Sequence, residues 1–128
     1  LEEDLAQLLM YVAQGKLAQR NAIAMSDTAA LTVVMAAKGY PGTPEKGGAI
    51  GSVDDVSSDT VQVFHAGTAI KDGALVANGG RVLNVTALGN SIGEAQTRAY
   101  AAVDAIDFPS GFCRQDIGWR EVAREQDN

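Results

Sequence analysis

The chain has 128 residues, a net charge of −6 and a sequence pI near 4.6, so it is long enough for one core-bearing domain and lacks the basic surface that nucleic-acid binding requires. No apolar run approaches the ~20 residues that a membrane-spanning helix needs. The single cysteine excludes an internal disulfide, and we therefore expect a reducing compartment, the cytoplasm.

Residues 1–15 have the pattern of an amphipathic helix. Leucine and valine recur at three- and four-residue spacing behind a run of acidic residues, and Gly15 stands where a C-terminal cap belongs. Because such a stripe needs a partner surface and the chain begins at Leu1, we expect a piece of a longer protein. Residues 16–28 predict a linker or a short strand around residues 22–24.

The middle of the chain alternates strand patterns with turns rich in glycine. The expected elements are a buried strand at 30–37, a long loop at 39–51, a strand at 60–66, a hairpin over 68–77 that turns at Asp72-Gly73, and a strand at 81–88.

A helix is expected to begin near Ser91, because Ser91 and Glu94 have the spacing of a capping box. It should run to about Ile106, since Pro109 prevents continuation. The tail at residues 111–119 is short and mixed. Short strands joined by hairpins, together with one well-marked helix, predict an α+β fold with mostly antiparallel strands.

Arg81 is the main binding candidate. It stands at the mouth of a strand directly after Gly79 and Gly80, and a guanidinium beside bare backbone suits a phosphate or carboxylate. Strict alternation places Arg81 on the face of Leu83, Val85 and Ala87, where it either reaches solvent or lines a cleft.

The other motifs favour structural roles. Residues 42–49 lack the Lys-Ser/Thr ending of a P-loop, and residues 88–93 lack the middle glycine of a dinucleotide fingerprint. Ser91 and Glu94 are expected to occupy the free amides at the helix start. The side chains predicted to be structural or solvated are His65, Lys71, Cys113 and a C-terminal ion-pair cluster of Arg114, Asp116 and Arg120. No catalytic set and no metal-ligand set is predicted, since the chain has one histidine and one cysteine.

A series of segments also carries a family resemblance. In chain order they are Gly39-Tyr40-Pro41-Gly42 with Lys46-Gly47, Val63-Phe64-His65-Ala66-Gly67-Thr68, Lys71-Asp72-Gly73, Asn78 to Gly89, Glu94-Ala95-Gln96 with Ala99-Tyr100, and Arg114-Gln115-Asp116-Ile117-Gly118. Together they resemble the C-terminal domain of the phosphoribosylamine–glycine ligases, also called glycinamide ribonucleotide synthetases, over about residues 31–120. Residues 1–15 resemble the helix after the metal-binding strand of the same family's ATP-grasp region.

The resemblance implies two parts, namely the end of an ATP-grasp region with a linker at residues 1–28 and a barrel-sandwich-like, substrate-side domain at residues 29–128. The implied activity is the ATP-dependent joining of glycine to 5-phosphoribosylamine, which gives glycinamide ribonucleotide, ADP and phosphate in de novo purine biosynthesis. ATP and Mg²⁺ or Mn²⁺ would be bound mainly by the remaining domains of the enzyme, so the isolated chain is expected to be inactive. The implied contacts to the substrate phosphate are Arg81, Gly80, Gly79 and Lys71.

Two other classes stay open. Lys71 near a tight hairpin turn resembles the modified lysine of a lipoyl or biotinyl carrier module, although the usual methionine neighbours are missing. The apolar stripe at residues 1–12 also suits an oligomerisation domain.

Overall fold

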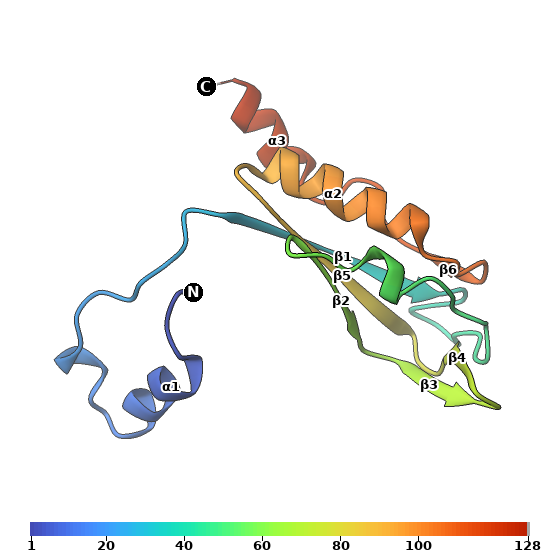
Figure 1. Ribbon diagram of the computed structural model, residues 1–128, viewed down its shortest axis with the longest axis horizontal. Coiled ribbons are helices and arrows are strands. Elements are labelled where there is room, and N and C mark those ends of the chain that lie inside the picture. Colours follow the sequence, from blue (N-terminus) through green and yellow to red (C-terminus); the bar gives the residue numbers. More distant parts are fainter. Residues whose placement is uncertain (128) are drawn as a thin grey trace.

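The computed structural model describes residues 1–127, which form two sheets and three α-helices (Figure 1). The strands are β1 (Ala29–Ala37), β2 (Val61–His65), β3 (Thr68–Lys71), β4 (Ala74–Ala77), β5 (Arg81–Gly89) and β6 (Gly111–Phe112). The helices are α1 (Leu5–Ala13), α2 (Ile92–Ala105) and α3 (Trp119–Gln126), with short 3-10 turns η1 (Leu17–Gln19) and η2 (Asp54–Val56). All paired strands are antiparallel, in one sheet of order β2-β5-β1-β6 and a separate β3-β4 hairpin, which confirms the α+β class.

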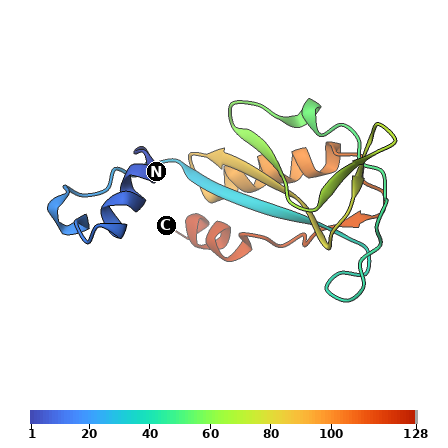
Figure 2. The ribbon, with the colours of Figure 1, turned by 90° about the horizontal axis from the view of Figure 1, so that it is seen from below.

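Helix α2 covers one face of the four-stranded sheet, as Figures 1 and 2 show from two sides, and the core lies between these two layers. Alternate strand residues point toward the helix, because side chains of a strand have a period of two. The buried members from the strands include Leu31, Val33 and Met35 of β1, Val61 and Val63 of β2, and Leu83, Val85 and Ala87 of β5. The other face of the sheet carries Thr32, Val34, Gln62 and Phe64, which are exposed. The sheet therefore has one packed face and one open face.

Helix α2 begins at the predicted cap. The Ser91 hydroxyl accepts a hydrogen bond from the Glu94 amide at 3.1 Å, and the Glu94 carboxylate accepts one from the Asn90 amide at 2.6 Å. The helix buries Ala95, Ala99, Ala102 and Val103, while Ile92 is only half-buried. Small alanines let the helix lie close on the sheet, which brings the two layers into van der Waals contact.

The N-terminal segment lies apart from the sheet in both views (Figures 1 and 2). Helix α1 begins at Leu5 rather than Leu1, because the Asp4 carboxylate caps it by accepting from the Gln7 amide at 3.0 Å. The linker that follows contains η1, and residues 22–24 do not form a strand. Leu8 is buried, but Leu5, Leu9 and Val12 are each more than half exposed, at 58%, 57% and 55%, so most of the apolar stripe of α1 is not covered by the described residues.

The C-terminal tail is more ordered than its sequence indicates. β6 adds to the edge of the sheet by pairing with Ala36 and Ala37, and α3 follows as a helix that the sequence does not predict. The Tyr100 hydroxyl donates to the Arg114 carbonyl at 2.7 Å and accepts from the Ile117 amide at 3.1 Å. These bonds tie the segment between β6 and α3 to α2, next to the β1 edge of the sheet.

Candidate functional site

A β-bulge in β5 decides where Arg81 lies. Met35 pairs with Leu83, but the next residue of β1, Ala36, pairs with Arg81, so Val82 is an extra residue on β5. Val82 and Leu83 are both fully buried, and Arg81 shares a face with its partner Ala36. The prediction that Arg81 lies on the face of Leu83 is therefore wrong, because the bulge shifts the alternation by one residue.

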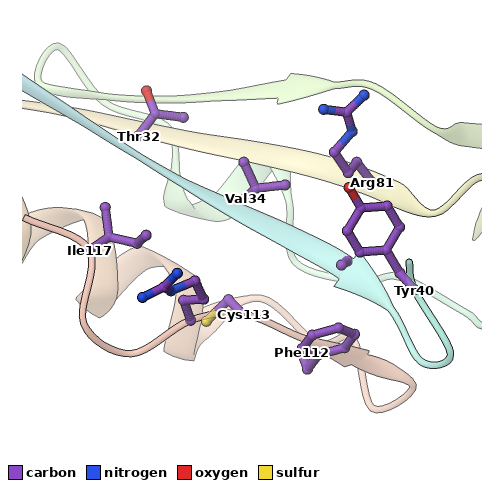
Figure 3. A pocket seen from close by; sticks show the side chains of 9 residues that line it. Thr32, Val34, Tyr40, Arg81, Phe112, Cys113 and Ile117 are labelled. Atoms are coloured by element: carbon purple, nitrogen blue, oxygen red, sulfur yellow. The ribbon is translucent and has the colours of Figure 1, made fainter. Parts of the chain in front are cut away.

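Arg81 borders two pockets on the open face, and the first is apolar. This apolar pocket has a volume of about 270 Å³ and is lined by Thr32, Val34, Ala36, Tyr40, Arg81, Phe112, Cys113, Arg114 and Ile117 (Figure 3). Its wall combines the open side of β1 with the segment that follows β6. Figure 3 shows the Tyr40 ring beside the Arg81 side chain at one end of this wall.

The second pocket is polar and larger, at about 670 Å³. This polar pocket shares Val34, Tyr40 and Arg81 with the first, and its other lining residues are Ala66, Gly67, Asn78, Gly79, Gly80 and Asn84. It offers two amide side chains and bare glycine backbone next to one guanidinium. Such a set can bind an anion with hydroxyl groups nearby, because amides and guanidinium groups donate hydrogen bonds in fixed directions.

The charge of Arg81 is not neutralised within residues 1–127. Five of the ten basic residues, Arg20, Lys38, Arg98, Arg114 and Arg124, form ion pairs with carboxylates. The Arg81 guanidinium has neither an ion pair nor a hydrogen bond to the described part of the chain. An unpaired guanidinium at the border of two pockets is available to an anionic ligand.

The glycines before Arg81 have structural reasons of their own. A Cβ at Gly79 would lie 3.2 Å from the Gly67 Cα, and a Cβ at Gly80 would lie 2.6 Å from the Tyr40 Cδ2. The close approach that each glycine permits is therefore an approach of the chain to itself. Both still line the polar pocket, and their contact with a ligand stays a prediction.

Lys71 lies outside the two pockets that Arg81 borders. It lines a third, smaller pocket together with Lys46, and Asn78 belongs to both this pocket and the polar pocket. Lys71 is the last residue of β3 and pairs with Ala74, while Asp72 and Gly73, with φ of 51° and 81°, make the turn. The lysine thus does not sit at the tip of the hairpin, where a carrier module would present it.

The remaining polar candidates have partners in the chain. The exposed His65 ring lies 3.1 Å from the Thr68 hydroxyl, as expected of a structural histidine. Burial raises the pKa of the Cys113 thiol, and the negative charge of Asp104 raises it further. A raised pKa fits the inert role predicted for this cysteine.

The predicted C-terminal ion-pair cluster forms only in part. Arg114 pairs with Asp116 at 2.7 Å and holds the pKa of that carboxyl below its usual range. Arg120 instead stacks on Trp119, with its guanidinium carbon 5.3 Å from the ring centroid.

The start of α2 is filled by a carboxylate from α3. Glu125 accepts hydrogen bonds from the Ile92 amide at 2.7 Å and the Gly93 amide at 3.0 Å. The expectation that Ser91 and Glu94 take all these amides is thus incomplete, because α3 was not predicted. The anion at this helix start is part of the chain itself.

Two further features concern metals and membranes. Within residues 1–127, no three side chains among His, Cys, Asp and Glu are grouped closely enough to hold a metal ion. None of the helices in that range has the length and apolar character needed to cross a bilayer.

Residues 30–120 match the family model for the phosphoribosylglycinamide synthetase C domain. The chain belongs to this family. A phosphoribosylamine–glycine ligase of Mesorhizobium japonicum is 64% identical over 126 residues, which cover 98% of this chain and 29% of that protein. The chloroplastic phosphoribosylamine–glycine ligase of Arabidopsis thaliana is 46% identical over 129 residues, covering 98% of this chain and 24% of that protein. The chain therefore spans less than a third of the length of these curated relatives.

A solved structure of the same family has a similar fold. The crystal structure of phosphoribosylamine–glycine ligase from Thermotoga maritima superposes with a TM-score of 0.60 at 41% identity, covering 68% of this chain and 21% of that chain. The match supports the arrangement of the antiparallel sheet and the helices described above.

In this phosphoribosylglycinamide synthetase C domain, the sequence singles out Arg81 as a binding candidate but not the residues that line the pockets beside it. Tyr40 was noted only as part of a resembling segment, and Asn78 and Asn84 were given no role. Asn84 could have been found, because strict alternation already placed it away from the buried residues of β5. Tyr40 could not, since it is 41 positions before Arg81 and meets it only through the fold.

Proposed function

We propose that this chain is the C-terminal, substrate-side part of a phosphoribosylamine–glycine ligase, which uses ATP to join glycine to 5-phosphoribosylamine. The products are glycinamide ribonucleotide, ADP and phosphate, in de novo purine biosynthesis. Family membership supports the proposal, since relatives at 64% and 46% identity carry this name. The complete reaction requires the other domains of the enzyme, because the chain spans less than a third of those relatives.

The proposed role of this chain is to hold the ribosyl phosphate of phosphoribosylamine. The unpaired Arg81 guanidinium between the two pockets is the observation that carries this role. The planar fork of an arginine can donate two parallel hydrogen bonds to a phosphate, and the backbone of Gly79 and Gly80 flanks the same pocket. Lys71 is proposed as a second contact, from the neighbouring pocket that shares Asn78.

Holding the phosphate would present the amine of the substrate to the reacting group. In the proposed reaction the glycine carboxylate takes up the γ-phosphoryl group of ATP, and the amine then attacks the acyl carbon and displaces phosphate. A fixed phosphate at one end of the sugar restricts where the amine can lie, and this favours the attack. No catalytic residue is assigned to this chain.

ATP and the metal are assigned mainly to segments outside this chain. Mg²⁺ or Mn²⁺ needs grouped carboxylate oxygens, and residues 1–127 do not group them. We further propose that residues 1–28 are the end of the ATP-grasp region and that residues 29–128 are the substrate-side domain. The exposed part of the α1 stripe would then pack against the remaining domains of the same enzyme, in the cytoplasm.

The experiment uses the full-length enzyme that contains this chain. Arg81→Ala should raise the KM for phosphoribosylamine about 10- to 150-fold, because a hydrogen bond to a charged group contributes about 1.5–3 kcal/mol and each 1.36 kcal/mol is tenfold. Arg120→Ala is the matched control, since it removes one positive charge from α3, outside both pockets. An unchanged KM in the Arg81 variant would remove Arg81 from the substrate site.

A second measurement tests the division of labour. The isolated chain should produce no ADP from ATP in the presence of glycine. Glycine-dependent ADP formation by the pure chain would mean that it binds and activates ATP itself.

A further inference from the structure

Tyr40 borders both pockets beside Arg81, and nothing so far assigns it a role. We propose that Tyr40 is a positioning residue for Arg81. Its ring, seated on the backbone of Gly80, forms the wall that keeps the Arg81 side chain at the border between the apolar and the polar pocket. This inference rests on the proposed role of Arg81 in binding the phosphate of phosphoribosylamine.

The seat of the ring is the backbone of the residue before Arg81. A Cβ at Gly80 would lie 2.6 Å from Cδ2, 3.3 Å from Cε2 and 3.6 Å from Cγ of Tyr40. These are its three nearest heavy atoms, so the Tyr40 ring is what any side chain at position 80 would strike first. Gly80 is not among the residues with positive φ, so its backbone conformation does not require glycine. The close approach of the Tyr40 ring explains why position 80 is a glycine.

The backbone on both sides of this contact is held by hydrogen bonds. The Ala37 amide donates to the Gly80 carbonyl at 2.9 Å, and the Tyr40 amide donates to the Ala37 carbonyl at 3.1 Å. Gly39 supplies the positive φ of 91° that the third residue of this turn requires. The start of the Tyr40 side chain is therefore fixed relative to Gly80, and the ring, which belongs to a residue 38% exposed, lies against the Gly80 backbone on one side.

The Tyr40 ring and the unpaired Arg81 side chain line the same two pockets, and this has a physical consequence. The Arg81 side chain has no hydrogen bond or ion pair within residues 1–127 to define its position. A long unpaired side chain loses rotamer freedom when it binds a ligand, and this opposes binding. The Tyr40 ring on one side reduces the number of positions open to Arg81 before the ligand arrives, which lowers that cost.

The test uses steady-state kinetics of the full-length enzyme. Tyr40→Ala should raise the KM for phosphoribosylamine about tenfold with little change in kcat and in the KM values for ATP and glycine. Tyr40→Phe keeps the ring and should restore the parental KM. Gly80→Ala should raise the same KM, because its Cβ would displace the ring.

Double variants identify the route of the effect. Combined with Tyr40→Ala, Gly80→Ala should add nothing further, since the ring it strikes is gone. Combined with Arg81→Ala, Tyr40→Ala should also add nothing, because Tyr40 acts through Arg81. Additive effects on the KM would overturn the inference.

The outcomes separate the two proposals. If Arg81→Ala leaves the KM unchanged, the role proposed for Arg81 fails, and the role of Tyr40 fails with it. If Arg81→Ala raises the KM and neither Tyr40→Ala nor Gly80→Ala does, only the inference about Tyr40 is overturned. Should Tyr40→Ala fail to fold, Gly80→Ala and Tyr40→Phe decide the question by the same KM comparison.

Discussion

The β-bulge at Val82 and strict strand alternation predict different effects of a polar substitution at this position on stability. Val82 is fully buried, so Val82→Thr would place a hydroxyl group in an apolar site with little change in the shape of the side chain. A hydroxyl that loses its bonds to water without a partner costs about 1–3 kcal/mol in proteins. If Val82 instead pointed toward solvent, on the face of the sheet opposite Leu83, the same substitution would cost almost nothing.

Val34→Thr is the matched control. Val34 lies on the neighbouring strand β1 and is 37% exposed on the open face, so its hydroxyl would keep contact with water. We expect a change in the free energy of unfolding within about 0.5 kcal/mol for this variant. The two variants carry the same chemical change in the same sheet, and they differ in burial.

Urea unfolding followed by far-UV circular dichroism measures both variants. Val82→Thr should lower the urea midpoint without a change in the slope of the free energy of unfolding against urea. In a thermal melt, its melting temperature should fall by about 5–15 °C, because each kcal/mol shifts a domain of roughly 100 residues by about 5 °C. Equal and small effects of the two substitutions would refute the bulge. Arg81 would then face the packed side of the sheet, and both the proposed phosphate contact and the role of Tyr40 would lose their geometry.

Two further predictions concern titratable groups near the C-terminus. The amides of Gly93 and Ile92 hold the pKa of the Glu125 carboxyl below its usual range. The contribution of Glu125 to the docking of α3 is therefore complete above the unfolded-state pKa near 4.5, and it is lost as the pH falls through the lower folded-state pKa. The fluorescence of Trp119, the single tryptophan, should change as this contribution is lost in acid. The Glu125→Gln variant should lack that change, and identical acid titrations of the parent and the variant would contradict the prediction. Burial raises the pKa of Cys113, so its alkylation by iodoacetamide at neutral pH should be slower than that of a free thiol, and an equal or faster rate would be the contrary result.

Local features of the fold could be predicted because their causes are local. The hairpin turn at Asp72 and Gly73 has positive φ at both residues, as an Asp-Gly pair favours. The start of α2 at Ser91 follows from a hydrogen bond between residues three positions apart. In such cases neighbouring residues supply both partners, and the sequence indicates the structure without knowledge of the rest of the chain.

The features that were missed depend on partners far apart in the sequence. Helix α3 has no side-chain cap at its start, and its Glu125 bonds to amides 32 and 33 positions earlier. β6 is two residues long and forms only because the edge of β1 accepts it. Neither element has a sequence pattern strong enough to predict it, because tertiary contacts supply its stability.

The sequence by itself therefore determined the segments of β1 to β5, α1 and α2, the acidic and single-cysteine character of the chain, its family resemblance and the choice of Arg81. Only the tertiary structure decided which face Arg81 occupies and what lies beside it. The bulge at Val82 depends on the register between β1 and β5, and Tyr40 reaches Gly80 through a turn that one hydrogen bond, from the Ala37 amide to the Gly80 carbonyl, holds beside the start of β5. Register and close approach are set by the packing of distant segments, and the period of a single strand does not contain them.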